Sequence, residues 1–243
     1  MLSNTGNILV LGSVLFTSLI IYSTFENIKN KNFKISNKLI YFSMFQVTLI
    51  FTSFLLLTLA FIFSDFSLLA VYQNSHTSKP IFYKIAGVWG NHEGSLLLWV
   101  NIMVLFSYLF FAYNNKSDKV FRLYTLFIQN ILILGFLIFL ITDSNPFSKI
   151  LPVPNEGLGL NPILQDPALA IHPPLLYLGF VGSSIYFSAA IAAILSNSSG
   201  KNFASSIKIW VLISWSFQSL GIIVGSIWAY YELGWGGFWF WDP

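Results

Sequence analysis

The 243-residue sequence is 56% hydrophobic and 9% charged, has a formal net charge of +3 and contains no cysteine. Ordinary soluble domains contain about 25% charged residues, so this composition indicates a membrane protein. The lack of cysteine excludes disulfides, thiolate metal sites and a cysteine nucleophile. The basic residues are scattered and do not form the cluster expected of a nucleic-acid-binding surface.

Six apolar stretches are long enough to cross a bilayer, which takes about 20 residues for a helix. In chain order they are residues 8–25, 39–63, 95–113, 123–141, 175–195 and 209–229, and none contains a charged residue. The first is diluted by Gly12, Ser13, Thr17 and Ser18, but the segment before it lacks the basic residues of a signal peptide, so we expect a retained helix. The sequence therefore predicts an all-α, polytopic membrane bundle of about six transmembrane helices, with residues 1–243 as one membrane domain.

The first long loop, residues 64–94, ends in the motif "WGNHEGS". Gly90 and Gly94 allow a close backbone approach on either side of His92 and Glu93. In this setting His92 is a candidate ligand, and Glu93 is a candidate to orient it.

Plainer interpretations of this loop need no ligand. Glu93 can instead pair with Lys84, Ser95 can cap a surface turn, and Trp89 and Trp99 resemble an interfacial aromatic belt. His76, in the polar stretch "QNSHTSK", is expected to be a solvated loop residue.

The second long loop, residues 142–174, ends in "DPALAIHPPLLY". A residue before proline is disfavoured in the helical conformation, and proline suits the first turn of a helix. We therefore expect an extended His172 at the membrane-level start of the fifth span. There it could bind a metal through a neutral ring nitrogen, or form a simple hydrogen bond to a loop carbonyl.

The closing segment, residues 230–243, contains "WGGFWFWDP". Its paired glycines allow a flat surface to approach the backbone, and the flanking rings can stack on it. An aromatic belt explains some of these tryptophans but not the paired glycines. The segment therefore favours a binding platform for a large aromatic ligand. The platform candidates are Trp235, Gly236, Gly237, Trp239, Trp241 and Asp242.

The basic residues predict the orientation. Nine of the twelve lie in the loops after the first, third and fifth spans, whereas seven of the nine acidic residues lie on the opposite side. Because basic loops stay on the cytoplasmic side, the N-terminus and all three motifs are expected on the outer face.

These motifs together resemble a known family. "WGGFWFWD" fits the WGxxWxWD pattern of the heme-handling (WWD) proteins. With "WGNHEGSLLLW" and "PALAIHPPLLYLG" in the same order, the chain resembles the CcmF family of cytochrome c-type biogenesis proteins. The resemblance runs from about residue 87 to 243 by motif, and earlier by the layout of spans.

The resemblance implies heme handling in c-type cytochrome maturation. Heme would arrive on the chaperone CcmE and be positioned for thioether attachment to the CxxCH segment of apocytochrome c, with a CcmH-type subunit reducing the thiols. It implies the tryptophan-rich platform as the heme cradle, His172 as an axial ligand of the heme iron, and His92 and Glu93 as supports. No catalytic residue is assigned. The expected location is the bacterial or mitochondrial inner membrane, with the motifs facing the periplasm or intermembrane space.

Two features of that family have no counterpart here. Its second outer axial histidine lies beyond the WWD motif, and the histidines that hold its in-membrane heme are missing from the predicted spans. The sequence is therefore expected to be the N-terminal part of a longer CcmF-like protein. By itself it is expected to bind heme weakly and to lack lyase activity, until joined by the C-terminal portion.

Three alternatives remain at this stage. An NrfE-like lyase for a nitrite reductase heme is similar in sequence. A transporter would usually place ionisable residues inside its spans, and Gln46, Asn101, Gln129, Asn130 and Gln218 are interpreted instead as interhelical hydrogen-bonding residues. An assembly scaffold would use the WWD segment to bind a protein.

Overall fold

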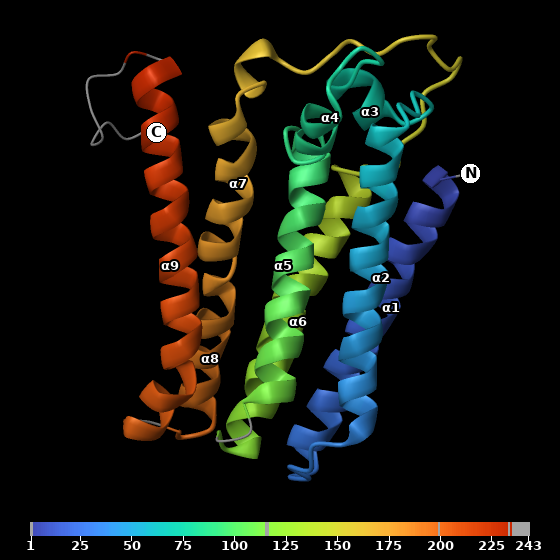
Figure 1. Ribbon diagram of the computed structural model, residues 1–243. Helices are drawn as coiled ribbons and strands as arrows, with labels where there is room; N and C mark the ends of the chain where they lie inside the picture. The colour runs from blue at the N-terminus through green and yellow to red at the C-terminus, as the bar shows by residue number, and fades with distance from the viewer. Residues whose placement is uncertain (1, 115–116, 199, 233, 235–243) are drawn as a thin grey trace.

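The protein is a bundle of long helices whose connections lie at its two ends (Figure 1). The computed structural model describes residues 2–114, 117–198, 200–232 and 234. In chain order the elements are α1 (Leu2–Lys29), α2 (Asn37–Ile62), α3 (Leu69–Asn74), α4 (Ile81–Gly87), α5 (His92–Tyr113), α6 (Lys119–Thr142), the 3₁₀ turn η1 (Pro162–Leu164), α7 (Pro167–Phe180), α8 (Ser183–Leu195) and α9 (Lys201–Glu232). The predicted all-α membrane bundle is confirmed for this part of the chain.

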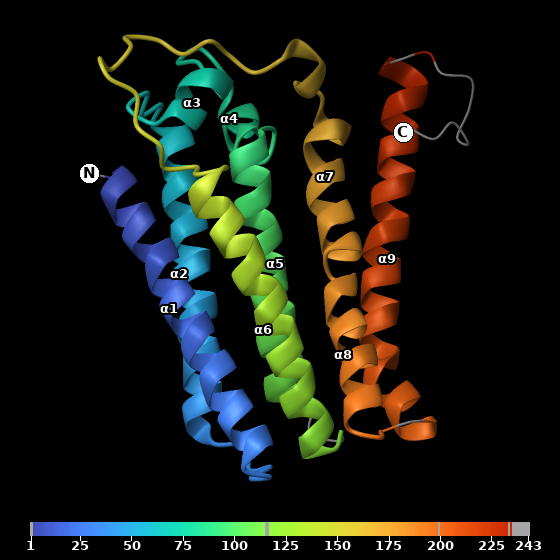
Figure 2. The ribbon, with the colours of Figure 1, turned by 180° about the vertical axis from the view of Figure 1, so that it is seen from behind.

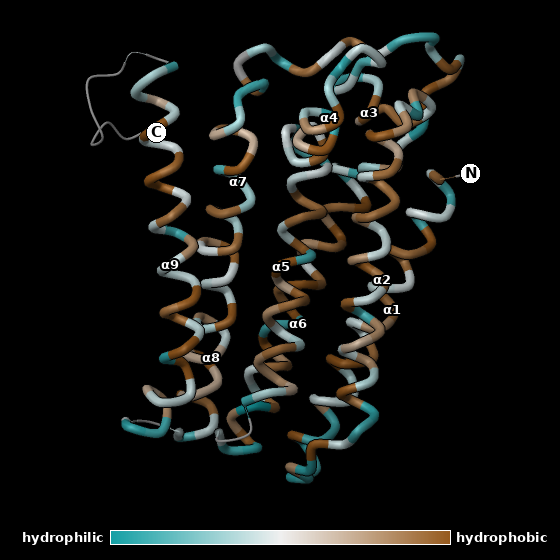
Figure 3. Tube along the Cα trace, in the orientation of Figure 1, coloured by the Kyte–Doolittle hydropathy of each residue, from teal (hydrophilic) through white to brown (hydrophobic). Residues whose placement is uncertain are grey.

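Within the described residues, six helical stretches are long and apolar enough to span a bilayer: α1, α2, α5, α6, α7 with α8, and α9. They match the six predicted spans but extend further at most ends. Figure 3 shows the reason, since the apolar middles of the helices continue into hydrophilic turns at both ends of the bundle. Glu93 and Arg122, expected just outside the spans, accordingly lie in the first turns of α5 and α6.

Helices α1, α2, α5 and α6 form a four-helix group, in which α1 and α5 each pack on both α2 and α6. Ser13 and Thr17 of α1 are completely buried. These two residues therefore face neighbouring helices, where small side chains permit close packing, whereas Ser18 is exposed and donates to Val14 O of its own helix.

A layer of amide side chains links these helices. Gln46 on α2 donates to Thr17 Oγ1 on α1 (2.7 Å) and to Asn130 Oδ1 on α6 (2.9 Å). Gln129 on α6 donates to Ser184 Oγ on α8 at 2.9 Å. The interhelical hydrogen-bonding role is thus confirmed for Gln46, Asn101, Gln129 and Asn130.

Helices α7 and α9 pack along a line of glycines, which we call the α7–α9 seam: Gly179 of α7 with Gly221 and Gly225 of α9. A Cβ atom added at Gly179 would lie 2.5 Å from the backbone nitrogen of Gln218, and one at Gly221 would lie 2.8 Å from Leu176 Cδ2. The two backbones approach this closely because neither helix has a side chain at these positions.

The motif-bearing loops gather at one end of the bundle. Both views place the start of α1, the short helices α3 and α4, the loop after α6 and the end of α9 at this end (Figures 1 and 2). Ser3 Oγ of α1 donates to Phe147 O at 2.7 Å, and a β-bridge pairs Leu68 with Lys149. The first two motifs therefore share one end with the end of α9, as predicted, whereas the third motif, residues 235–243, lies outside the described residues. That this end faces outward stays a prediction.

Candidate functional site

The helix that carries His172 begins earlier than predicted. Asp166 is its N-cap, with Oδ1 accepting from the backbone N–H groups of Ala168 (2.8 Å) and Leu169 (3.0 Å), and Pro167 takes the first helical position. The expectation of an extended His172 at the start of the span is wrong: His172 lies inside α7. The "DP" pair starts the helix more strongly than "HPP" does, because it supplies both a capping carboxylate and a preset proline.

Pro173 and Pro174 lie inside α7, where each lacks the N–H that would bond to the carbonyl four residues earlier. Pro174 leaves the carbonyl of Ala170 without its helical donor. The indole Nε1–H of Trp89, in the α4–α5 connection, donates to that oxygen at 2.9 Å. The first outer motif thus supplies the hydrogen bond that the second motif cannot make for itself.

The His172 ring reaches across to α9. Its Nδ1 lies 2.7 Å from the carbonyl oxygen of Gly221. A carbonyl only accepts, so Nδ1 donates to it, and in the neutral ring Nε2 carries the lone pair. The carbonyl belongs to a helix rather than to a loop, and this arrangement suits a metal ligand as well as a packed histidine.

His92 lies at the start of α5, where Asn91 Oδ1 caps the helix by accepting from Gly94 N at 2.8 Å. A Cβ atom at Gly94 would lie 1.7 Å from Val88 O, so the expected close backbone approach is confirmed. The capping role proposed for Ser95 is wrong, because Asn91 is one turn closer to the loop. Ser95 Oγ instead donates to His92 O at 3.0 Å.

The partners predicted for Glu93 are also wrong, while its place as a support of a heme site stays a prediction. Glu93 makes no hydrogen bond or ion pair with His92 or Lys84, and Lys84 Nζ donates to Ser64 Oγ at 2.8 Å. The His92 ring is oriented by the loop after α6, because its Nδ1 lies 2.8 Å from Ser144 Oγ.

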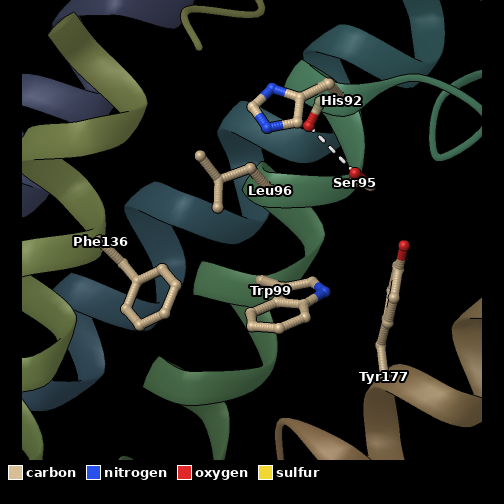
Figure 4. Close-up of a pocket in the computed structure, with 6 residues that line it drawn as sticks. All are labelled: His92, Ser95, Leu96, Trp99, Phe136 and Tyr177. Carbon is tan, nitrogen blue, oxygen red and sulfur yellow. Dashed lines mark hydrogen bonds between the residues drawn. The ribbon is translucent and has the colours of Figure 1, made fainter. Parts of the chain in front are cut away.

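A cavity of about 240 Å³ lies below His92, between α5, α6 and α7 (Figure 4). Trp99 lines it from α5 and packs edge to face on Tyr177 and tilted against Phe136, each at 5.8 Å between ring centroids. Trp89 and Trp99 therefore have specific partners between helices, unlike a generic aromatic belt. The lining residues are His92, Ser95, Leu96, Trp99, Phe136 and Tyr177.

The outer ends of α7 and α9 are tied together by Asp166. The hydroxyl of Tyr231, in the last turn of α9, donates to Asp166 Oδ1 at 2.6 Å. The chain then continues toward the tryptophan-rich segment. The six platform candidates, Trp235, Gly236, Gly237, Trp239, Trp241 and Asp242, lie outside the described residues.

The two long loops are held together by Glu156. Hydrogen bonds from the Thr77 hydroxyl and the Thr77 backbone N–H lower the pKa of the Glu156 carboxyl to about 2. The ring of His76 lies 2.8 Å from Ser78 Oγ and 3.9 Å from Glu156 Oε1, with a side chain that is 38% exposed. His76 is therefore a surface loop residue, as expected, and belongs to a loop contact rather than to a ligand site.

Gly221 and Gly225 were not singled out from the sequence, although they place His172. The available signal was "GIIVG", a pair of glycines four residues apart in an apolar helix, which is typical of a close helix–helix contact.

Comparison with known proteins identifies the family. The family model described as "Cytochrome C assembly protein" matches residues 89–243. The chain belongs to the cytochrome c assembly protein family. Among relatives in this family, the biogenesis protein CycK of Bradyrhizobium diazoefficiens is 50% identical over 198 residues, covering 82% of this chain and 30% of the relative. CcmF of Escherichia coli K12 is 50% identical over 194 residues, covering 79% and 30%. NrfE of Haemophilus influenzae is 45% identical over 188 residues, covering 77% and 30%.

A solved member of the cytochrome c assembly protein family has the same fold. The structure titled "Cytochrome c Heme Lyase CcmF" superimposes with a TM-score of 0.85 at 27% identity, covering 100% of this chain and 38% of the other. The chain spans about 30% of the length of the CycK and CcmF proteins that it matches in sequence. The predicted resemblance to CcmF is confirmed.

Proposed function

We propose that this chain is the N-terminal portion of a CcmF-like protein and holds heme on the outer face of the membrane for attachment to apocytochrome c. The observation that carries the proposal is the hydrogen bonding of the His172 ring. Its Nδ1–H is engaged by the Gly221 carbonyl, and among the described residues no hydrogen bond is made by Nε2. A histidine that binds metal through one nitrogen usually donates its other N–H to a carbonyl or carboxylate in this way.

Heme enters this proposal as a substrate. In the attachment reaction each cysteine thiol adds across a porphyrin vinyl group, so that sulfur bonds to one vinyl carbon and hydrogen to the other. No redox partner is consumed by the addition itself. What the protein must supply is position, because holding heme and thiol in register makes a bimolecular addition effectively unimolecular. His172 would fix the iron, and the tryptophan-rich segment would fix the ring.

The remaining parts of the site follow from this assignment. Trp235, Gly236, Gly237, Trp239, Trp241 and Asp242 would form the platform, entered directly from α9. His92, held by Ser144, would border the heme edge rather than ligate iron, because the cavity beneath it is only about 240 Å³. The proposed partners are CcmE, a CcmH-type subunit, apocytochrome c and the C-terminal portion of the protein, on the periplasmic or intermembrane-space side of an inner membrane.

Hemin titration of the purified chain in detergent tests the proposal. We expect a weak, mainly five-coordinate Soret spectrum that is lost in His172→Ala. The matched control is His76→Ala, which removes the same side chain from a surface loop and should leave the spectrum unchanged. Identical hemin spectra for the wild-type chain and His172→Ala would refute the assignment and favour a protein-binding scaffold.

A complementation assay separates binding from activity. His172→Ala in the full-length context should abolish cytochrome c maturation while the protein remains in the membrane. The 243-residue chain alone is expected to show no lyase activity. Normal maturation with His172→Ala would remove this residue from the mechanism.

A further inference from the structure

The imidazole of His172 lies over a glycine of α9. A Cβ atom added at Gly225 would lie 2.4 Å from His172 Cε1, 2.6 Å from Nδ1 and 3.1 Å from Nε2. These atoms are the edge of the ring that carries both nitrogens. Any side chain at position 225 would therefore have to displace the imidazole or separate the helices.

The same glycine pair supplies the hydrogen-bond acceptor. Gly221 lies one helical turn before Gly225, and its carbonyl points along α9 toward Gly225, where His172 Nδ1 reaches it at 2.7 Å. The ring is thus fixed at two points, by an acceptor at position 221 and by a side-chain-free surface at position 225. Moving the ring away from Gly225 would also move Nδ1 away from the acceptor.

We infer that Gly225 is a positioning residue, which holds the His172 ring against the Gly221 carbonyl and so selects the Nδ1–H tautomer, whose Nε2 is available to heme iron. This inference rests on the proposed role of His172. The partners that orient a metal-binding histidine typically account for about 10–100-fold in metal affinity. A glycine can have an effect of that size here because it admits the carbonyl contact that no larger residue permits.

The seam offers a matched control at Gly179. A Cβ atom there would lie 2.5 Å from the backbone nitrogen of Gln218, so Gly179→Ala strains the same seam at a different point from Gly225→Ala. It does so without touching the imidazole. Both variants add a methyl group to the α7–α9 seam, but that group meets the Gln218 backbone at position 179 and the His172 ring at position 225.

The first readout needs no heme. The chain has three histidines, so ¹⁵N-histidine NMR in lipid nanodiscs can resolve each ring, with His172 assigned from its loss in His172→Ala. We expect the Nδ1–H form for His172 in the wild-type chain and in Gly179→Ala. In Gly225→Ala we expect a mixture of both tautomers.

The second readout is hemin affinity, measured from the Soret band. Gly225→Ala should weaken binding by about 10–100-fold, to the level of His172→Ala, whereas Gly179→Ala should keep the wild-type affinity. If Gly225→Ala retains both the tautomer and the affinity, the inference is overturned and the role of His172 stands. Equal losses in both glycine variants also overturn it, because separation of the helices would then suffice. If the wild-type chain and His172→Ala bind hemin alike, both the proposed function and this inference fail.

A stability comparison keeps the test informative if Gly225→Ala folds poorly. Without the imidazole, the added methyl group has nothing to displace at that point. Gly225→Ala should therefore lower the Tm in the wild-type chain and lower it far less in the His172→Ala chain. An equal loss of Tm in both backgrounds would show that the ring is not what Gly225 accommodates.

Discussion

Replacing Trp89 by phenylalanine should destabilise the protein through one carbonyl group. The substitution keeps an aromatic ring but removes the indole N–H that donates to Ala170 O at 2.9 Å. Ala170 is 4% exposed, and Pro174 cannot supply the missing donor. A buried acceptor left unpaired costs about 1–3 kcal/mol, and interhelical hydrogen bonds in membrane proteins are worth about 0.6 kcal/mol on average and up to about 1.7. We expect the free energy of unfolding to fall by about 1–2 kcal/mol.

The second proline provides a control. In Pro174→Ala the new backbone N–H can bond to Ala170 O, so adding Trp89→Phe should cost about 1 kcal/mol less than it does in the wild-type chain. In Pro173→Ala the new N–H faces Leu169 O instead, and the cost of Trp89→Phe should be unchanged. The loss of ring volume is the same in all three backgrounds and cancels.

Unfolding in mixed micelles, followed by circular dichroism, measures these differences. The two proline backgrounds must differ for the explanation to hold. Should Trp89→Phe cost the same in both, within the roughly 0.5 kcal/mol expected of independent sites, Trp89 would be acting by packing alone.

Three further predictions concern other parts of the molecule. Gly94→Ala places a methyl group 1.7 Å from Val88 O and should destabilise the protein by about 3 kcal/mol or prevent its accumulation in the membrane. Gly135→Ala, whose methyl group would have nothing within 4 Å, should be tolerated. Equal expression and stability of the two variants would contradict the geometry. The Glu156 pKa is lowered from 4.5 to about 2, so its loop contact is fully present above pH 4.5 and is lost as the pH falls toward 2. Hydrogen exchange of residues 76–79 should therefore lose protection as the pH is lowered over that range. A loss of protection of the same size in Glu156→Gln would point to another group. In the cysteine-free chain, a cysteine at Asn155 should react with an impermeant thiol reagent applied from outside and one at Asn202 should not; the reverse pattern would invert the topology.

The spans and the grouping of the loops could be predicted because both depend on composition over many residues. Charge asymmetry and apolar length are averages over many residues. Glu93 and Arg122 were expected just outside the spans and lie in the first turns of helices, and this difference does not alter either average. The start of α7 could not be predicted in the same way. It depends on a competition between Asp166 with Pro167 and the Pro173–Pro174 pair, in which an indole 81 residues away in sequence supplies the donor that Pro174 lacks.

The partners of the candidate residues were equally inaccessible from sequence. Spacing along the chain suggested Glu93 as the partner of His92, yet Ser144 takes that place from the end of α6. Likewise, the partner of His172 is a backbone carbonyl, and because every residue has one, the sequence does not indicate which carbonyl His172 contacts. The glycines that allow that contact do leave a trace, and "GIIVG" could have indicated a close helix contact, although not the histidine that fills it.

The carboxylate of Asp166 has a mechanical consequence. One oxygen, Oδ1, accepts the two N–H groups that start α7 and also the hydroxyl of Tyr231 in the last turn of α9. A force that pulls on the end of α9 therefore loads the first turn of α7 directly, six residues before His172. A load on the end of α9 would thus reach the helix that carries His172 through a single hydrogen-bonded oxygen.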